Sequence, residues 1–150
     1  MPHTVESVRS FVRDCVELGR VHLGIFIDGV HVGNVTCSPD YANRHSTIAF
    51  LIGEVEYRGV GLVKLAISGT LSYLFENLGI HRVEASAYAN HDASLWLLKS
   101  LGFQQEGIMR DRFIFEGNYV DDVAVAILDH EWRELSQKYP PIKVIDTSTD

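Results

Sequence analysis

The chain has 150 residues, 46% of them hydrophobic and 22% charged, and a formal net charge of −7. This length suits a single domain with a real core, and the acidic balance argues against duplex nucleic acid as a partner. It favours a cationic or neutral substrate. No apolar run reaches the ~20 residues of a membrane span, and the acid-bearing N-terminus lacks the basic start of a secretion signal. We therefore expect a cytoplasmic protein that binds neither nucleic acid nor membrane.

Cysteine and histidine give no sign of metal or disulfide chemistry. Cys15 and Cys37 lie far apart without CxxC spacing, which is typical of small buried residues in a reducing compartment. The seven histidines include no pair at the spacing of metal ligands, so no metal is expected.

The first half of the chain predicts a helix, a hairpin and a strand. Apolar residues at helical spacing predict a helix over residues 4–18, ended by Gly19. Residues 21–38 alternate around Asp28 and Gly29, which predicts a β-hairpin. Residues 45–54 are rich in β-branched and aromatic side chains, which favours a buried strand.

The second half predicts two helices and three strands. A helix runs from Leu62 to a stop at Gly79, and a strand follows over residues 81–89. The next helix is capped by Asn90 or Asp92 and stops at Gly102. Residues 103–128 predict a second antiparallel hairpin that turns at residues 116–118.

The order of elements predicts an α+β fold with a mixed sheet. The strand, helix and strand in the middle imply a parallel crossover, and the hairpins around it are antiparallel. We expect one domain over residues 1–133 and a polar tail over residues 134–150. On the 90–103 helix, Trp96, Leu97 and Leu101 are expected in the core.

A glycine-rich junction at residues 58–63 leads from a strand into the long helix. The first turn of a helix carries amide groups without internal partners and about half a positive charge. Glycine at 59 and 61 would leave that backbone bare for an anion such as a phosphate, and Arg58 and Lys64 add positive charge. The alternative is plain turn and cap chemistry.

These motifs resemble the GNAT acyltransferases. The phosphate motif of that family is Gln/Arg-x-x-Gly-x-Gly/Ala, and Arg58, Gly61 and Val63 occupy those places, with Val63 departing from the small residue. Downstream, "HRVEASAYANHDASLWLLKSLGFQQEG" and "GNYVDDVAVAILDHEW" are similar to the RimJ/RimL-type branch. The resemblance covers roughly residues 5 to 133.

The resemblance implies a GNAT fold: a twisted, mostly antiparallel mixed sheet with a central parallel strand pair that splays apart, flanked by helices. It implies acetyl-CoA as cosubstrate, with pantetheine in the splay and the diphosphate at the glycine junction. A backbone N–H near Ile52 would hold the oxyanion of the thioester. The implied cofactor-binding residues are Leu51, Ile52, Gly53, Arg58, Gly59, Val60, Gly61, Leu62, Val63, Asn90 and Ser94.

The catalytic residues are predicted less directly. Glu54 and Glu56 leave the strand beside the splay and are the best placed general bases, ahead of His45 and His91. Leu98 stands where many relatives have the tyrosine that protonates the thiolate. Ser94 matches the serine of the branch's Asn-x-x-Ser motif and would take that role, and the same register puts His91, rather than Asn90, in the asparagine place.

The last hairpin carries four further candidates. Arg110 and Arg112 alternate with apolar neighbours, so we expect them on one strand face, in solvent or facing a ligand. Tyr119 and Asp121 match the branch's hairpin pattern, in which a substrate-facing role is open.

The family normally begins with a strand and a helix that precede the first helix of this chain. Without that strand, the segment around residues 22–28 becomes a sheet edge with unpaired backbone groups. We therefore expect either a homodimer that covers this edge or a reading frame that was started late.

Two functions remain open at this point. The first is an acetyl-CoA-dependent N-acetyltransferase whose acceptor is a primary amine: a protein N-terminus, an amino sugar, a polyamine or another small amine. The second is a non-catalytic acyl-CoA-binding or interaction module of the same fold. Only the enzyme releases thiol from acetyl-CoA in the presence of an amine.

Overall fold

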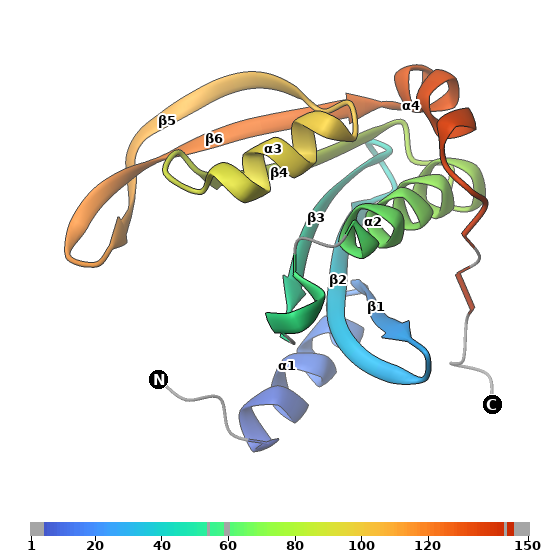
Figure 1. Cartoon of the computed structure of the whole chain (residues 1–150), viewed down its shortest axis with the longest axis horizontal. Coiled ribbons are helices and arrows are strands. Elements are labelled where there is room, and N and C mark those ends of the chain that lie inside the picture. The colour runs from blue at the N-terminus through green and yellow to red at the C-terminus, as the bar shows by residue number, and fades with distance from the viewer. Residues whose placement is uncertain (1–4, 54, 59–60, 143, 146–150) are drawn as a thin grey trace.

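A computed structural model of the chain describes residues 5–53, 55–58, 61–142 and 144–145, and it contains one six-stranded sheet flanked by helices (Figure 1). In chain order the elements are α1 (Val5–Glu17), β1 (Val21–Ile27), β2 (Val30–Asp40), β3 (His45–Ile52), the 3₁₀ turn Val55–Tyr57, α2 (Leu62–Ser72), the π-helical turn Tyr73–Asn77, β4 (Arg82–Tyr88), α3 (Asp92–Ser100), β5 (Gln104–Phe115), β6 (Asn118–Leu128), α4 (Asp129–Leu135) and the 3₁₀ turn Ser136–Lys138.

The sheet order is β1-β2-β3-β4-β6-β5, and every neighbouring pair is antiparallel except β3 and β4, which are parallel. The predicted α+β class and the GNAT-type mixed sheet with one central parallel pair are therefore confirmed. Both hairpins turn where the sequence predicts. Asp28 and Gly29, like Glu116 and Gly117, adopt positive φ, as a tight two-residue turn requires.

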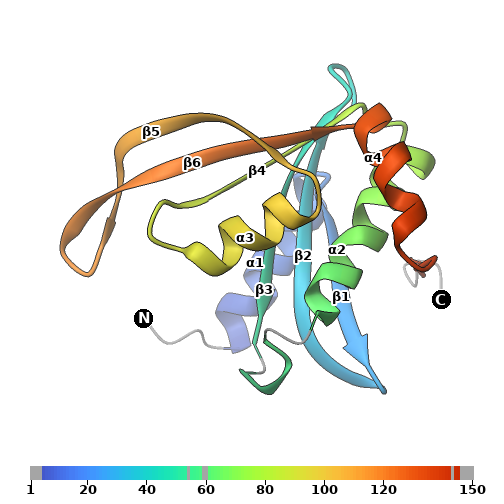
Figure 2. The same ribbon diagram turned by 45° about the horizontal axis from the view of Figure 1, so that its top comes forward.

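The core lies between the sheet and helices α2, α3 and α4. Ile67 and Leu71 of α2, Leu98 of α3 and Val83 of β4 are fully or almost fully buried in one cluster, and each such side chain contributes roughly 1.5–3 kcal/mol. Figure 2 shows α2 and α3 in front of the strands and α1 behind them. On the α1 side, the rings of Phe11 and His22 contact each other in a T-shaped arrangement, with 5.6 Å between centroids.

Residues beyond position 133 also contact the domain. Trp132 is buried and its indole N–H donates to Ser72 Oγ at 3.0 Å. The ring of Tyr139 stacks on Trp132 with 5.4 Å between centroids, and the Tyr139 hydroxyl donates to the Ser100 carbonyl at 3.3 Å. The division of the chain at residue 133 stays a prediction.

Strand β1 lies at one end of the sheet, as the sequence predicts, and its register shifts between Ile25 and Phe26. Its pairing with a second copy stays a prediction. None of the helices in the described ranges combines the length and apolarity needed to cross a bilayer.

Helix α3 differs from its prediction in two respects. Its N-cap is His91, neither Asn90 nor Asp92, and His91 Nδ1 accepts a hydrogen bond from the Ser94 amide at 3.2 Å. Trp96 was predicted to be in the core and is 68% exposed, whereas Leu101 is buried as expected. The reason is geometric, because Trp96 lies roughly 200° around the helix axis from the buried Leu98.

Candidate functional site

Strands β3 and β4 separate soon after they meet. They pair only through His45–Arg82, Ser46–Val83 and Thr47–Glu84. On its other edge, β3 pairs with β2 along its whole length, from His45 to Ile52. The backbone of residues 48–52 therefore has no register partner in β4, which is the splay that the sequence resemblance implies.

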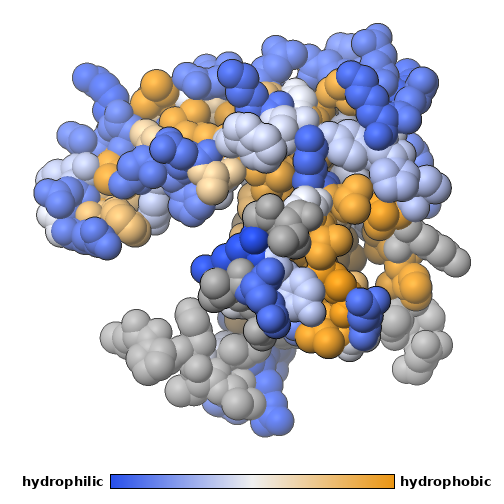
Figure 3. Space-filling view, in the orientation of Figure 1, coloured by the Kyte–Doolittle hydropathy of each residue, from blue (hydrophilic) through white to orange (hydrophobic). Residues whose placement is uncertain are grey.

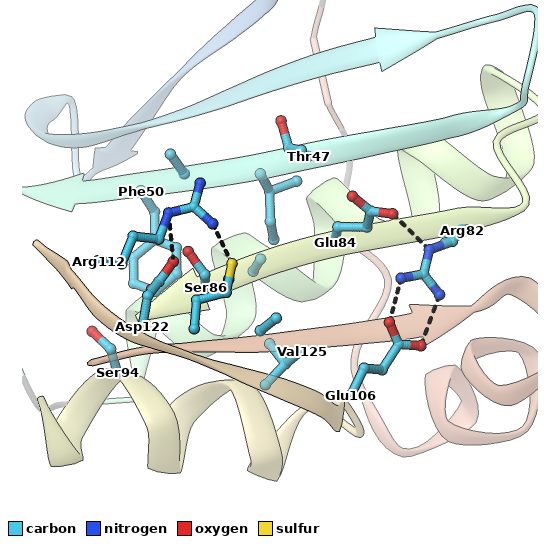
Figure 4. Close-up of a pocket in the computed structure, with 15 residues that line it drawn as sticks. Thr47, Phe50, Arg82, Glu84, Ser86, Ser94, Glu106, Arg112, Asp122 and Val125 are labelled. Carbon is cyan, nitrogen blue, oxygen red and sulfur yellow. Dashed lines mark hydrogen bonds and ion pairs between the residues drawn. The ribbon is translucent and has the colours of Figure 1, made fainter. Parts of the chain in front are cut away.

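A cavity of about 520 Å³ occupies this gap. Figure 3 shows a corresponding hollow between two parts of the molecule. One part consists of α3 and the β5–β6 hairpin, and the other consists of α1 and strands β1–β3. Side chains from five elements line the cavity (Figure 4); those used below are Thr47, Phe50, Glu84, Ser86, Ser94, Glu106, Arg112 and Asp122.

The backbone of β3 turns Ile52 toward the gap. The Gly53 amide donates to Val32 of β2 at 3.0 Å, so Gly53 is engaged on the β2 side. Because backbone groups alternate between the two edges of a strand, the N–H and C=O of Ile52 point away from β2. Arg58 confirms this direction for the carbonyl, since its Nε and Nη2 donate to Ile52 O at 3.1 and 2.9 Å. The amide predicted to hold an oxyanion therefore belongs to the open edge.

The first turn of α2 has no side-chain cap hydrogen bond. Its N-cap, Gly61, has φ of 79° and is exposed, and a Cβ placed there would meet no atom of the described residues within 4 Å. The helical bonds begin with the Leu65 amide, which donates to Gly61 O at 3.2 Å. Helix geometry thus leaves the amides of Leu62, Val63 and Lys64 without helical acceptors, next to the positive end of the helix dipole. Gly59 and Val60, also predicted here, lie outside the described residues.

Two cations flank this turn in the sequence, Arg58 before it and Lys64 within it. The Lys64 ammonium lies 5.6 Å from the centroid of the Tyr139 ring and 6.0 Å from that of Trp96. Arg58 donates two of its five N–H groups to Ile52 O, and the other three have no acceptor among the described residues. An anion at the α2 tip therefore fits the donors and the charge that surround it.

The carboxylates predicted as general bases do not line the cavity among the described residues. Glu56 is exposed in the Val55–Tyr57 turn, and Glu54 lies outside the described residues. Glu84, which sequence reasoning did not single out, does line the cavity at the last paired position of β4. The signal for it was a carboxylate between two apolar strand residues, Val83 and Ala85, beside the predicted splay.

Arg82 ties Glu84 to β5. Its Nε donates to Glu84 Oε1 at 2.7 Å, and its two terminal nitrogens hold the carboxylate of Glu106, one of them at 2.8 Å. The hydrogen bonds from Arg82 hold the pKa of Glu106 below its ordinary value, and the same bonds raise the pKa of Arg82. Figure 4 shows the other carboxylate oxygen of Glu84 pointing away from Arg82.

The histidine candidates serve local structure. His91 caps α3, as described above. His45 Nε2 lies 3.5 Å from Asp40, its buried Nδ1 has no hydrogen-bond partner in the described part of the chain, and neither nitrogen belongs to the cavity lining.

Ser94 is half-buried and lines the cavity from the start of α3, whereas Asn90 is exposed in the preceding turn and does not. The structure therefore has His91, rather than Asn90, three positions before the serine at the cap. The proton-donating role of Ser94 stays a prediction.

Of the two hairpin arginines, only Arg112 lines the cavity. Strand β5 loses its register with β6 between Met109 and Phe113, and Asp111 has φ of 52° in this bulge. Asp121 stabilises the bulge, because its Oδ1 accepts from the Asp111 amide at 2.8 Å. Tyr119 is 69% exposed.

Asp122 is a second carboxylate that sequence reasoning missed. It lines the cavity and is only 2% exposed. Its Oδ2 lies 3.7 Å from Nε of Arg112, whose side chain is 49% exposed. The sequence offered no signal that distinguishes it from the neighbouring Asp121.

Comparison with known proteins connects this geometry to a family. The family model described as "Acetyltransferase (GNAT) domain" matches residues 1–104. The chain is 29% identical over 121 residues to the putative ribosomal N-acetyltransferase YdaF of Bacillus subtilis, covering 80% of this chain and 66% of that protein. It is 29% identical over 85 residues to the [ribosomal protein uS5]-alanine N-acetyltransferase of Escherichia coli, covering 57% of this chain and 43% of the relative.

A crystal structure of a probable acetyltransferase superposes with a TM-score of 0.78 at 26% identity, covering 88% of this chain and 77% of the other. The chain thus spans 43% of the length of the uS5-alanine relative and 66% of the length of YdaF. On the family model, the fold and the shared motifs, the chain belongs to the GNAT acetyltransferase family and to its RimJ/RimL-type branch.

Proposed function

We propose that the chain transfers an acetyl group from acetyl-CoA to a primary amine. The observation that carries this proposal is that two sets of backbone amides, which residues 53–61 separate in the chain, lack backbone partners among the described residues. One set is the first turn of α2 at Gly61, and the other is the edge of β3 that β4 leaves open. A diphosphate fits the first and an extended amide-bearing arm fits the second.

The binding roles follow from the contacts around the cleft. The amides of Leu62, Val63 and Lys64 would hold the diphosphate, with charge from Lys64 and from the unspent donors of Arg58. The Ile52 amide would pair with pantetheine as a residue of an added strand would, and Leu51, whose backbone groups face β2, would contribute its exposed side chain. Gly53 would contribute shape alone, because its amide already donates to Val32.

The reaction needs an electrophile, a base and an acid. Acetyl-CoA supplies a thioester whose carbonyl carbon the neutral amine attacks directly. The Ile52 amide would donate to the developing oxyanion. Among the described carboxylates we assign the base to Glu84, because it lines the cavity where β3 and β4 part. Ser94 would protonate the departing thiolate.

The acceptor is an amine, and we expect the chain to prefer acceptors that carry positive charge. The uS5-alanine relative acts, by its name, on a ribosomal protein, and the net charge of −7 raises the local concentration of positive molecules near this chain. A protein N-terminus, a polyamine and an amino sugar all remain within this class.

A thiol-release assay with acetyl-CoA and a panel of peptides, polyamines and amino sugars tests the proposal. CoA binding is measured in parallel by thermal shift, since a ligand at 100 times its Kd stabilises the fold by about 2.7 kcal/mol. Thiol release with one acceptor class is expected. Binding without release across the panel would favour the non-catalytic module, and absence of binding would contradict both.

A further inference from the structure

Where the β5–β6 hairpin lines the cavity, the carboxylate of Asp122 is buried and incompletely paired. Asp122 is 2% exposed, and a buried charge is costly unless it is paired and hydrogen-bonded. Its partner atom, Nε of Arg112, stands 3.7 Å away, beyond the ~2.7–2.9 Å of a charge-assisted hydrogen bond. Asp122 therefore has capacity for a closer cation.

Arg112 is held weakly at this place. Its other contacts are the sulfur of Met109 and the ring of Phe113, whose centroid lies 5.5 Å from the guanidinium carbon. It belongs to the bulge in which β5 leaves the ladder of β6, and half of its side chain is exposed. Figure 4 shows the guanidinium extending from β5 across the cavity toward β3, above Asp122. The side chain can leave this position without breaking a bidentate pair.

Aromatic rings stand on the same face of the sheet. Tyr88 is the register partner of Asp122, and its ring lies 5.1 Å from that of Phe113 and 5.9 Å from that of Phe115. Aromatic faces attract organic cations, and the Phe113 ring already holds the guanidinium. A carboxylate with aromatic neighbours suits an alkylammonium group and disfavours a carboxylate ligand.

We infer that Arg112 holds the place of a substrate cation, and that a second ammonium group of the acceptor, at the end away from the reacting amine, displaces it and binds Asp122. The inference rests on the proposed function for the identity of the acceptor, and it narrows the acceptor class to cationic amines. The opposite arrangement, in which Arg112 itself binds an anionic acceptor, predicts the reverse preference.

Three amines of equal length test the inference in the wild-type protein saturated with CoA. Calorimetry measures the binding of 1,5-diaminopentane, 5-amino-1-pentanol and 5-aminopentanoate. All three carry a primary amine at one end, and the other end is positive, neutral and negative, respectively. The diamine should bind most tightly and the aminopentanoate least. Preference for the aminopentanoate, or equal binding of all three, would overturn the inference.

Two variants should move diamine binding in opposite directions. Asp122→Asn should weaken it by about tenfold or more, since a hydrogen bond to a charged group is lost. Arg112→Gln removes the competing cation and should strengthen it severalfold. Glu134→Gln, which removes an exposed carboxylate on α4, should leave it unchanged. CoA affinity and melting temperature verify that each variant folds.

A purely structural role for the pair predicts a different pattern, in which both variants lower stability and change diamine binding in the same direction. That pattern would overturn the inference. Since the readout is binding, its failure is distinct from that of the proposed function: absent thiol release with intact diamine preference contradicts only the enzyme, and turnover without the preference contradicts only this site.

Discussion

The two edges of β3 differ more than any other pair of edges at the centre of the sheet. Toward β2 the ladder runs from His45 to Ile52, and toward β4 it stops at Thr47. Strand β4 turns away because it follows β6 over its full length, from Arg82 to Tyr88. One strand therefore serves both purposes: its β2 edge anchors it, and its β4 edge offers backbone groups that need another partner.

The buried core should contribute more to the stability of the fold than the open end of β3 does. Leu71→Ala removes a fully buried side chain of α2 and should lower the free energy of unfolding by about 2–5 kcal/mol. Leu51→Ala, on a side chain that is 67% exposed at the open end of β3, should lower it by less than about 0.5 kcal/mol. Urea denaturation measures the free energy of unfolding of both variants. Equal decreases in the two variants would contradict this difference between the core and the open end of β3.

The open side should carry the chemistry. Glu84→Gln should lower kcat/KM for the amine by roughly 10²-fold or more, as expected for loss of a general base, with little change in the KM for acetyl-CoA. The matched variant Glu56→Gln, on an exposed carboxylate outside the cavity, should retain most activity. The reverse order in steady-state kinetics would return the role to the carboxylate predicted from sequence.

A pair of glycines sharpens the comparison at the α2 tip. Gly61 and Gly117 both have φ of 79°, and a Cβ at either would meet no described atom within 4 Å, so alanine at either should cost about 1–2 kcal/mol of stability. Only Gly61→Ala should weaken CoA binding, by about tenfold, because its methyl group would stand before the bare amides. Calorimetry measures the affinity of each variant for CoA. Equal affinities would contradict the binding of the diphosphate at the first turn of α2.

The smallest expected effect is the contribution of His22, on β1, to the pH dependence of stability. Burial, with repulsion from His31 as the lesser cause, lowers the pKa of His22 from its ordinary 6.5. The unfolded chain then binds the proton more readily, so stability is full above pH 6.5 and falls as the pH drops toward the folded pKa. His22→Gln should reduce this dependence, by less than about 1 kcal/mol between pH 7 and 5. An unchanged pH profile of the melting temperature would contradict it.

Local signals predicted most of the fold. Asp28 with Gly29 and Glu116 with Gly117 placed both hairpin turns, because few residues tolerate positive φ. The periodicity of the long helix predicted α2, and the glycine at position 61 led to the anion-binding turn, which stays a prediction. The splay itself came from family resemblance, since the pairing of β4 with β6 is a long-range property that no short pattern contains.

The side chains of the site were harder to predict. Glu84 and Asp122 lie on strands whose two faces both carry apolar residues, so alternation alone did not identify the face that borders the cavity. Arg112 lines the cavity and Arg110 does not, because the strand bulges at Asp111, whose amide donates to Asp121. Counting residues along the strand cannot detect such a bulge. Trp96 was assigned to the core by its residue type, but its angle on α3 turns it outward.

The most direct test of the account is a crystal structure of the protein with CoA. It should have diphosphate oxygens within hydrogen-bonding distance of the amides of Leu62, Val63 and Lys64, with the pantetheine arm along the open edge of β3. A CoA molecule bound elsewhere, or a β3 edge that β4 or a side chain closes at saturating CoA, would contradict it.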